Sequence, residues 1–381
     1  MNKFKYYFIL LLAGIAIVSC NKNDDDDVET VPLRDYKEQY KADSDSIMKY
    51  LKSNYIKSVS ANFDIEIEKI PVGGAQVSIW DQTVYPLQNR VVYSNDVYYT
   101  VYYLSLRKGT GAAPCNYDKI SAAYSGNTLN NKVFDTSYGL PRDFSLEPYI
   151  AQPVIEGWPE ILPQFKVGTA TMATDGSGVI TYDNFGAGVM FLPSGLGFYG
   201  SGQTDIPAYS CVVFSFKLLG LQRLDHDFDG VFDYQEDLNG DGYLYDFRNT
   251  TKYPKPPANL IDDTDGDGLA DFIDVDDDGD GYTTFLEITK PAGKVGKVVE
   301  NGVEVNYGVS KYYPFDPVAD NPNTLNVDET ELWAIPRKPT GALTDPSKPE
   351  SAANPKKFVD EDYKAIGRKR IHLDNTYPYK N

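Results

Sequence analysis

Aspartates at alternate positions, in runs that each end in a glycine, recur between residues 225 and 287 and constrain this chain more than any other feature. Alternate side chains on a tight turn point inward, and carboxylates so arranged repel one another unless a cation holds them. Calcium takes about six to eight oxygen ligands of this kind, and a glycine at the sixth loop position permits the sharp turn. The sequence therefore predicts a loop-rich calcium-binding module over residues 223–289.

The candidate calcium ligands follow four overlapping registers. The first loop offers Asp225, Asp227, Asp229, the backbone carbonyl of Val231, Asp233 and Glu236. A shorter copy offers Asp237, Asn239 and Asp241, but Arg248 stands at its last ligand position and leaves the site incomplete. The second pair offers Asp263, Asp265, Asp267, Asp271 and Asp274, then Asp276, Asp278, Asp280 and Glu287. These loops resemble thrombospondin type 3 repeats, which implies structural Ca²⁺; a solvated acidic linker is the alternative, and the agreement of four registers argues against it.

The first residues have the pattern of a secretory signal peptide. Two lysines precede an apolar run from Phe8 to Val18, which is shorter than the roughly 20 apolar residues of a spanning helix. Ile17-Val18-Ser19-Cys20 resembles the bacterial lipobox, so residues 1–20 are expected to be a lipoprotein signal sequence. The resemblance implies cleavage before Cys20, which becomes the lipidated first residue of the mature protein. The chain is then held to a membrane by its lipid anchor. The alternative is a secreted protein with an ordinary cleavage site.

Residues 21–32 are expected to form an acidic tether that contains the run Asp24 to Asp27. Acidic residues directly after a lipidated cysteine also resemble the signal that sends Bacteroidota lipoproteins to the outer face of the outer membrane. We therefore expect an outer membrane lipoprotein of the cell envelope, periplasmic or surface-exposed. A net charge of −19 excludes duplex nucleic acid as a partner, because phosphate binding needs clustered basic residues.

Between the tether and the acidic loops the periodicity predicts an α+β fold. Residues 33–95 form an N-terminal extension with one amphipathic helix over 33–55, expected to dock on its own chain, and a strand over 63–67. Residues 96–222 form the central domain, an antiparallel sheet wrapped on one short helix. Its expected elements are strands over 97–106, 119–124, 132–135, 189–192 and 211–219, a turn at Ser125-Gly126, a helix over 154–165, and a surface insertion over 169–186. Residues 290–381 are expected to be a loop-rich extension.

The central domain resembles the FKBP-type peptidyl-prolyl cis-trans isomerases. The family's motifs appear in order as Tyr124-Ser125-Gly126, Phe134-Asp135, Val154-Ile155-Glu156-Gly157-Trp158, Tyr199-Gly200, Ile206-Pro207 and Phe214. The resemblance implies that Trp158 forms the floor under a proline ring, with Tyr124, Phe134, Val154, Ile206 and Phe214 around it. It also implies that the Ile155 N–H and the Tyr199 hydroxyl hold substrate carbonyls and that Asp135 organises the rim. For Phe134 and Phe214 taken alone, ordinary core packing is the alternative.

This chemistry needs no cofactor and no nucleophile. The stretch from Lys119 to Leu221 contains no histidine. An X-Pro bond rotates slowly because amide resonance imposes a barrier of about 18–20 kcal/mol. A dry aromatic pocket favours the twisted amide, whose carbonyl carries less charge than in the planar forms. The sequence thus predicts an isomerase that assists exported or surface proteins containing proline. The alternative is a non-catalytic FKBP-like binding or scaffold lipoprotein in surface adhesion or gliding machinery.

Three departures from the family pattern bear on the efficiency of catalysis. Arg142 follows Pro141 where the family usually has an aromatic wall, the loop from Ser201 to Asp205 is short, and residues 169–186 are an insertion. Whether Cys115 and Cys211 form a disulfide is left open by their spacing.

Overall fold

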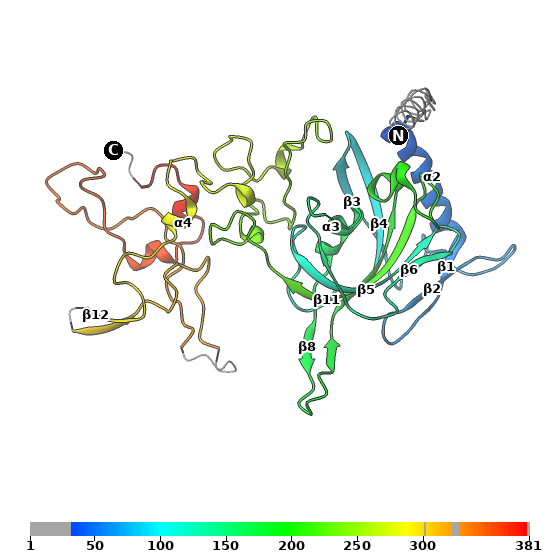
Figure 1. Cartoon of the computed structure of the whole chain (residues 1–381), viewed down its shortest axis with the longest axis horizontal. Helices are drawn as coiled ribbons and strands as arrows, with labels where there is room; N and C mark the ends of the chain where they lie inside the picture. Colours follow the sequence, from blue (N-terminus) through cyan, green and yellow to red (C-terminus); the bar gives the residue numbers. More distant parts are fainter. Residues whose placement is uncertain (1–31, 152, 301, 322–327, 379–381) are drawn as a thin grey trace, which may run out of the picture. The chain divides into compact units, whose positions relative to one another are not determined.

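The computed structural model describes residues 32–151, 153–300, 302–321 and 328–378, and the structural statements below concern these residues. Residues 35–381 form one compact unit, which Figure 1 colours from blue to red along the chain. The predicted signal peptide, Cys20 and almost all of the tether lie outside the described residues. No helix in the described part of the chain has the length and apolar character needed to cross a membrane.

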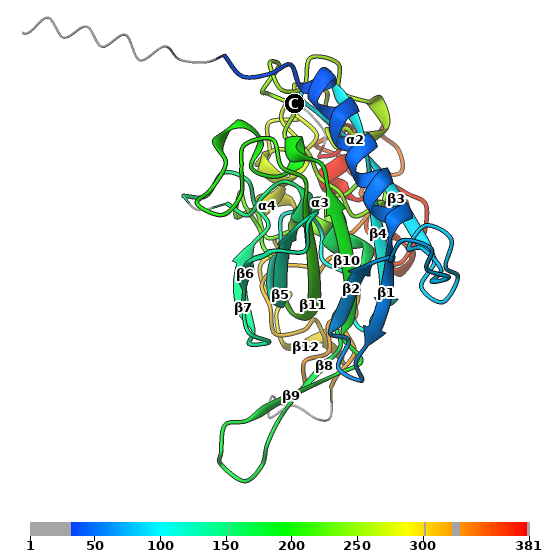
Figure 2. The same ribbon diagram turned by 90° about the vertical axis from the view of Figure 1, so that its right-hand side faces the viewer.

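The amphipathic helix α2, Tyr36–Ser53, is present and docks on its own chain as predicted. The Asp35 carboxylate caps it by accepting the N–H groups of Lys37 and Glu38 at 3.0 Å. The helix packs against strand β4, Val97–Arg107, and the 3₁₀ turn Ser194–Leu196 (Figure 2). There its buried Asp43 accepts the Ser194 N–H at 2.8 Å and the Ser194 hydroxyl at 2.6 Å. An antiparallel hairpin follows, made of β1, Asn54–Val59, and β2, Ile65–Lys69.

The central domain is built on one seven-stranded sheet in which every pairing is antiparallel. The strand order is β3-β4-β10-β11-β5-β6, and β7 also pairs with β5. The strands are β3 Leu87–Ser94, β4 Val97–Arg107, β5 Lys119–Thr128, β6 Val133–Thr136, β7 Arg142–Ser145, β10 Gly186–Leu192 and β11 Val212–Gln222.

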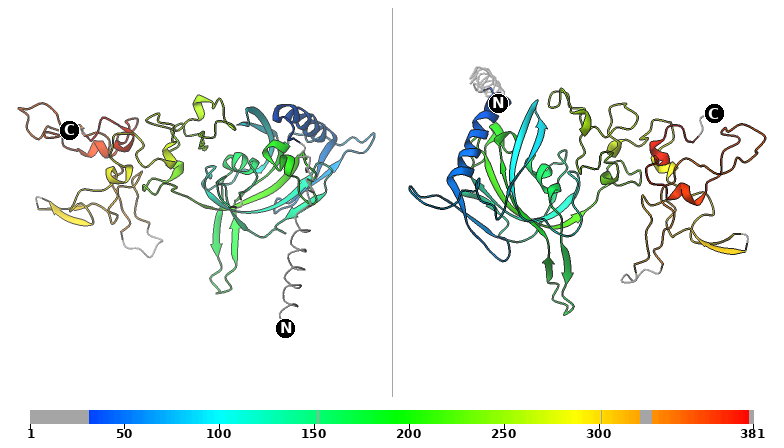
Figure 3. Two further views of the ribbon diagram at one scale, coloured as in Figure 1. Left: turned by 45° about the horizontal axis from the view of Figure 1, so that its top comes forward. Right: turned by 180° about the vertical axis from the view of Figure 1, so that it is seen from behind.

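One short helix packs on this sheet, as the α+β prediction requires. Helix α3, Gly157–Ile161, continues into a 3₁₀ turn, Leu162–Gln164. Its side chains Trp158, Ile161 and Leu162 are buried in one apolar cluster with Phe214 and Phe216 of β11. The curved sheet and the helix within it are visible from two sides in Figure 3. Burial of this cluster therefore fixes where the Trp158 indole lies.

Three local predictions differ from the structure. Strand β3 belongs to the central sheet, although its residues were assigned to the N-terminal extension. The predicted turn at Ser125-Gly126 is wrong, because β5 runs through both residues and pairs with β11 there. The insertion over residues 169–186 is exposed as expected, but most of it forms a hairpin of β8, Thr169–Met172, and β9, Ile180–Asp183.

The region after β11 is loop-rich, as predicted. Its short elements are α4 Thr284–Glu287, β12 Lys297–Glu300 and β13 Val303–Asn306, with 3₁₀ turns Asp233–Gln235, Ala258–Leu260, Asp271–Ile273, Asp360–Tyr363 and Ile371–Leu373. Small apolar clusters hold it together, one of them around Val231, Ile288 and Ile335. Cys115 and Cys211 are free thiols buried in different clusters, which answers the question of a disulfide.

Candidate functional site

Aromatic rings from four elements meet around Trp158. Its ring centroid lies 5.4 Å from Tyr124 on β5, 5.4 Å from Phe144 on β7 and 5.5 Å from Phe214 on β11. Phe134 on β6 contacts Phe214 at 5.5 Å, nearly edge to face. Trp158 and Phe214 are each 4% exposed, whereas Tyr124 and Phe134 are half-buried. The structure therefore brings the predicted floor and three predicted walls into one cluster, which we call the aromatic cup.

Gly126 allows the rings of the cup to approach the sheet. A Cβ added at this glycine would lie 2.6 Å from the Phe214 ring and 2.7 Å from the Phe134 ring. Any side chain there would push both rings outward. The glycine thus serves close packing inside a strand rather than the turn that its sequence context suggested.

The rim of the cup carries a polar pair. The Tyr124 hydroxyl donates a hydrogen bond of 2.6 Å to the exposed Asp135 carboxylate. Burial and Asp135 raise the pKa of Tyr124 to about 12, while the nearby Arg142 guanidinium acts in the opposite direction. The hydroxyl therefore stays protonated at neutral pH. Arg142 lies at this rim, where the family pattern has an aromatic wall.

Val154, Ile155 and Ile206 complete the apolar surroundings. Val154 and Ile155 are half-buried against the cluster that contains Trp158, and Ile206 is buried within it. The Ile155 carbonyl accepts the Trp158 N–H at 3.0 Å at the start of α3. The Ile155 N–H has no hydrogen-bond acceptor among the described residues. It is thus available to a carbonyl of a bound polypeptide.

Tyr199 contacts rings outside the predicted site. Its ring stacks on Tyr36 of α2 at 4.1 Å with an angle of 8°, and it meets Tyr209 edge-on at 5.0 Å. Among the described ring contacts it has none with Trp158. The adjacent Phe198 instead contacts Phe134 at 6.3 Å and packs on the cup. Sequence reasoning missed Phe198, although its place beside the Tyr-Gly motif was the available signal.

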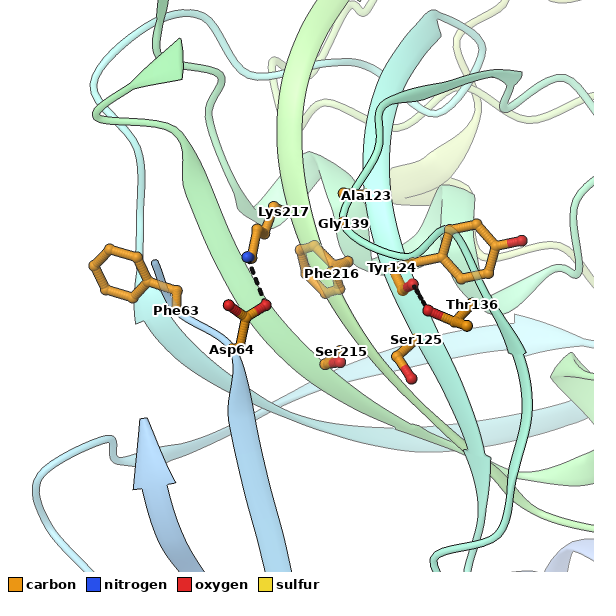
Figure 4. A pocket seen from close by; sticks show the side chains of 10 residues that line it. All are labelled: Phe63, Asp64, Ala123, Tyr124, Ser125, Thr136, Gly139, Ser215, Phe216 and Lys217. Carbon is orange, nitrogen blue, oxygen red and sulfur yellow. Dashed lines mark hydrogen bonds and ion pairs between the residues drawn. The ribbon is translucent and has the colours of Figure 1, made fainter. Parts of the chain in front are cut away.

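A small cavity of about 80 Å³ lies beside β5 and β11 and takes in the backbone of Tyr124 (Figure 4). An ion pair of 2.6 Å between Lys217 and Asp64 borders it. Figure 4 shows the Tyr124 ring directed away from this pair. The cavity is therefore separate from the aromatic cup and too small for a prolyl residue with its neighbours.

Four carboxylates gather in the acidic loops. Oxygen atoms of Asp227, Asp229, Glu236 and Asp277 all lie within 4.8 Å of one another. Asp229, Glu236 and Asp277 are almost fully buried, and neither oxygen of Glu236 or Asp277 has a hydrogen-bond partner among the described residues. Burial and the neighbouring carboxylates raise the pKa of Asp229 to about 7 and of Asp277 to about 10. Buried, unpartnered oxygens converging in this way are the donor set that Ca²⁺ prefers.

Asp277 was absent from the predicted ligands, since it falls between two members of the alternating pattern. Only the fold carries it to the first loop. Asp233, which was predicted, is used elsewhere: its carboxylate accepts the backbone N–H of His226 and contacts the His226 ring at 2.7 Å. Asp225 accepts the Gly230 N–H with one oxygen, and its other oxygen is buried with no hydrogen-bond partner in the described part of the chain. Val231 donates its N–H to Asp229 at 2.7 Å.

The other predicted ligands occupy three further loops. In the second, Asp237, Asn239 and Asp241 accept backbone N–H groups of the tight turn. The third and fourth hold two more groupings of carboxylates, Asp263 with Asp265 and Asp267, and Asp276 with Asp278 and Asp280. Asp271 is bound by Thr264 and Asp274 accepts the Asp276 N–H, whereas a buried oxygen of Glu287 has no partner among the described residues.

Comparisons with known sequences cover two stretches. Residues 111–174 match the family model of FKBP-type peptidyl-prolyl cis-trans isomerases. Residues 226–326, which include the acidic loops, match the model described as BamM C-terminal. The peptidyl-prolyl cis-trans isomerase Mip of Coxiella burnetii is 38% identical over 68 residues. That match covers 17% of this chain and only 27% of the curated relative.

Solved structures similar to this chain include two bacterial proteins. A peptidyl-prolyl cis-trans isomerase from Pseudomonas syringae is 22% identical, and the match covers 35% of this chain and 80% of that one, with a TM-score of 0.26. FkpA from Escherichia coli is 28% identical, with coverage of 35% and 51% and a TM-score of 0.26. Scores this low support no inference about the whole chain.

Proposed function

We propose that this chain is an FKBP-type peptidyl-prolyl cis-trans isomerase that acts on proline-containing polypeptides. The aromatic cup is the observation that supports it: Tyr124, Phe144 and Phe214 contact the Trp158 indole, Phe134 contacts Phe214, and Tyr124 donates to Asp135 at the rim. Tyr124, Phe134, Phe144 and Trp158 lie within the stretch that matches the isomerase family.

The cup acts by making the planar amide less favourable than the twisted one. A prolyl ring that enters the cup leaves water. The planar amide has the more polar carbonyl, so it loses more solvation free energy there than the twisted amide does. Each 1.4 kcal/mol of this difference is worth about a factor of ten in rate. The Ile155 N–H holds the chain of the substrate in place, and the Tyr124–Asp135 pair orders the rim. No proton transfer or covalent step is required.

Exchange between cis and trans forms of an X-Pro peptide tests the proposal. The chain from residue 21 onward should accelerate exchange, and a macrolide such as FK506 should compete with the peptide. Asp135→Ala and Tyr124→Phe should each slow exchange, since both break the rim pair. A folded chain that gives no acceleration would refute the proposal.

A non-catalytic proline-binding module is the second candidate, and two observations favour it. Tyr199 stacks on Tyr36 instead of contacting the ring of Trp158, and Arg142 lies at the rim instead of an aromatic side chain. Such a module would hold proline-containing segments in a surface scaffold. Peptide binding without faster exchange would establish this function in place of catalysis.

We further propose that Ca²⁺ binds the acidic loops and stabilises them. Asp227, Asp229, Glu236 and Asp277 would hold one ion, because their buried oxygens converge without partners among the described residues. The ion would supply positive charge to the cluster and take no part in isomerisation. Calorimetric titration with Ca²⁺ tests this proposal, with Mg²⁺ as the comparison cation, because Mg²⁺ demands a tighter octahedral shell. Failure to bind Ca²⁺ at millimolar concentration would refute it.

The cellular setting is proposed from the N-terminal sequence alone. Ile17-Val18-Ser19-Cys20 supports a lipid anchor on Cys20 and a place in the cell envelope as an outer membrane lipoprotein. An isomerase held there would assist exported or surface proteins. Labelling with a fatty-acid analogue, and its loss in Cys20→Ala, tests the anchor.

A further inference from the structure

A groove of about 530 Å³ lies next to the aromatic cup. The central domain lines it with Tyr149, with Val154 and Ile155 before α3, and with Phe198. Residues of the module over 223–289, which we call the acidic region, line the groove as well, among them Tyr245 and Tyr253. The volume falls in the range of roughly 300–1,000 Å³ that is usual for binding pockets.

Buried polar contacts hold the two sides of the groove together. Glu160 of α3 is buried, pairs with Arg90 at 3.2 Å and accepts the Tyr245 hydroxyl at 3.0 Å. The Tyr243 hydroxyl donates to the Glu160 backbone carbonyl at 2.8 Å, two residues from Trp158. On the other flank, the Asn116 amide bonds both backbone groups of Leu244, at 2.6 and 2.8 Å. The acidic region is thus attached to the helix that carries the floor of the cup.

The surface of the groove suits an extended polypeptide. Tyr149 is 61% exposed and Phe198 is half-buried, so both rings are open to a ligand. Lys252 and Glu156 form an ion pair of 3.0 Å between the two sides and provide polar groups at its edge. Aromatic-lined grooves with few polar groups bind extended, proline-containing segments, which keep their own backbone solvated.

The groove adjoins the cup through three side chains that contact both. Val154 and Ile155 line the groove and also pack on the cluster around Trp158. Phe198 lines the groove and contacts Phe134 of the cup at 6.3 Å. A chain whose prolyl ring enters the cup therefore passes into the groove within its next residues.

We propose that this groove is a second substrate subsite, formed jointly by the central domain and the acidic region, and that it binds the residues flanking the isomerised proline. The inference rests on the proposed function, because it takes the cup as the place of the prolyl ring. It assigns substrate contact to a region that otherwise serves only metal binding. Long polypeptides are then the preferred substrates, and Tyr149 contributes to selecting them.

The test compares a tetrapeptide with a longer peptide that carries the same X-Pro core and aromatic flanking residues. The chain from residue 21 onward, in Ca²⁺, should show a KM about tenfold lower for the longer peptide, the gain expected from burying one aromatic side chain. Tyr149→Ala should remove this advantage and leave tetrapeptide exchange unchanged, while Tyr149→Phe should retain it. Tyr98→Ala is the matched control, since Tyr98 is also an exposed tyrosine, at 57%, and lies outside the groove.

A second variant tests the wall from the acidic region. Asn249 lines the groove and is exposed, so Asn249→Trp should fill it and raise KM for the longer peptide alone. Equal KM values for both peptides in the wild type would refute the subsite, and so would an unchanged KM difference between the peptides in Tyr149→Ala. A third outcome is that neither peptide is isomerised, but calorimetry shows tighter binding of the longer peptide and Tyr149→Ala abolishes this difference. That outcome would support the subsite and refute the isomerase function.

Discussion

The central domain and the acidic loops fill their interiors with opposite kinds of side chain. The cluster around Trp158 is made of rings and aliphatic groups from the sheet and from α3, and its burial is favourable in itself. The first acidic loop buries Glu236 and Asp277 against other carboxylates without hydrogen-bond partners among the described residues. Burial of such charges is costly unless a cation compensates them. The first region is therefore stable by packing, whereas for the second we propose that a bound cation stabilises it.

Removing the indole should give the largest effect. Trp158→Ala is expected to lower the free energy of unfolding by about 3–5 kcal/mol, because it leaves a cavity at the centre of the cluster. It should also abolish acceleration of exchange, as measured on the tetrapeptide, and leave Ca²⁺ binding intact. Trp80→Ala is the control, since Trp80 contacts Tyr102 and Lys52 away from the cup. An unchanged rate of exchange in Trp158→Ala would contradict the proposal that the aromatic cup is the site of isomerisation.

Removing the metal should act on the other region alone. Chelation of Ca²⁺ is expected to cost about 2.7 kcal/mol of stability per site, relative to Ca²⁺ at a hundredfold its Kd. Differential scanning calorimetry should show the loss, while tetrapeptide exchange persists because the cup contains no carboxylate cluster. Asp277→Asn should weaken Ca²⁺ binding about tenfold or more, and Asp360→Asn, at an exposed position outside the loops, should not. Equal Ca²⁺ affinities in these two variants would show that Asp277 is not a ligand of the ion.

The stack of Tyr36 on Tyr199 joins helix α2 to the segment beside the cup. Tyr36→Ala removes a ring pair of the kind worth about 0.5–1.5 kcal/mol and frees the segment that carries Phe198 and Tyr199. We expect a modest loss of stability in urea denaturation and a KM for the tetrapeptide that rises a few-fold. Lys37→Ala, on the exposed side of α2, should change neither value. Identical behaviour of the two variants would show that α2 has no influence on the cup.

Glu160 lies where the two regions meet, and its titration should give the smallest effect. Burial raises the pKa of Glu160 above its ordinary value of 4.5, although Arg90 opposes the shift. The folded state then binds more protons than the unfolded state, so the contribution of Glu160 to stability is complete below pH 4.5 and is lost as pH rises through the higher folded pKa.

Denaturation of the wild type and Glu160→Gln across this range measures the effect. The stability of the wild type relative to the variant should fall with rising pH, by less than the roughly 1.4 kcal/mol per pH unit that one proton gives. If the stability of the wild type relative to the variant instead rises with pH, the ion pair with Arg90 outweighs the cost of burying the Glu160 charge.

Much of the architecture follows from local patterns. Helix α2 and strands β2, β4 and β11 obey the periods of their residues, because one face of each must be buried. The aromatic cup could be predicted in part because its residues occur as motifs at set intervals. Gly126 misled the prediction, since a glycine beside a serine indicates a turn, whereas here it makes room for two rings from other strands.

The order of residues along the chain is enough to predict two kinds of interior: an aromatic one between residues 96 and 222, and an acidic one between residues 223 and 289. Which residues meet inside them depends on how the chain folds. The fold brings Asp277 to the first loop, places Tyr199 on Tyr36, and joins the acidic region to α3 through Glu160. Periodicity and loop spacing report on interactions between residues a few positions apart in the sequence. These contacts join residues 41 to 163 positions apart, so no local pattern can predict them.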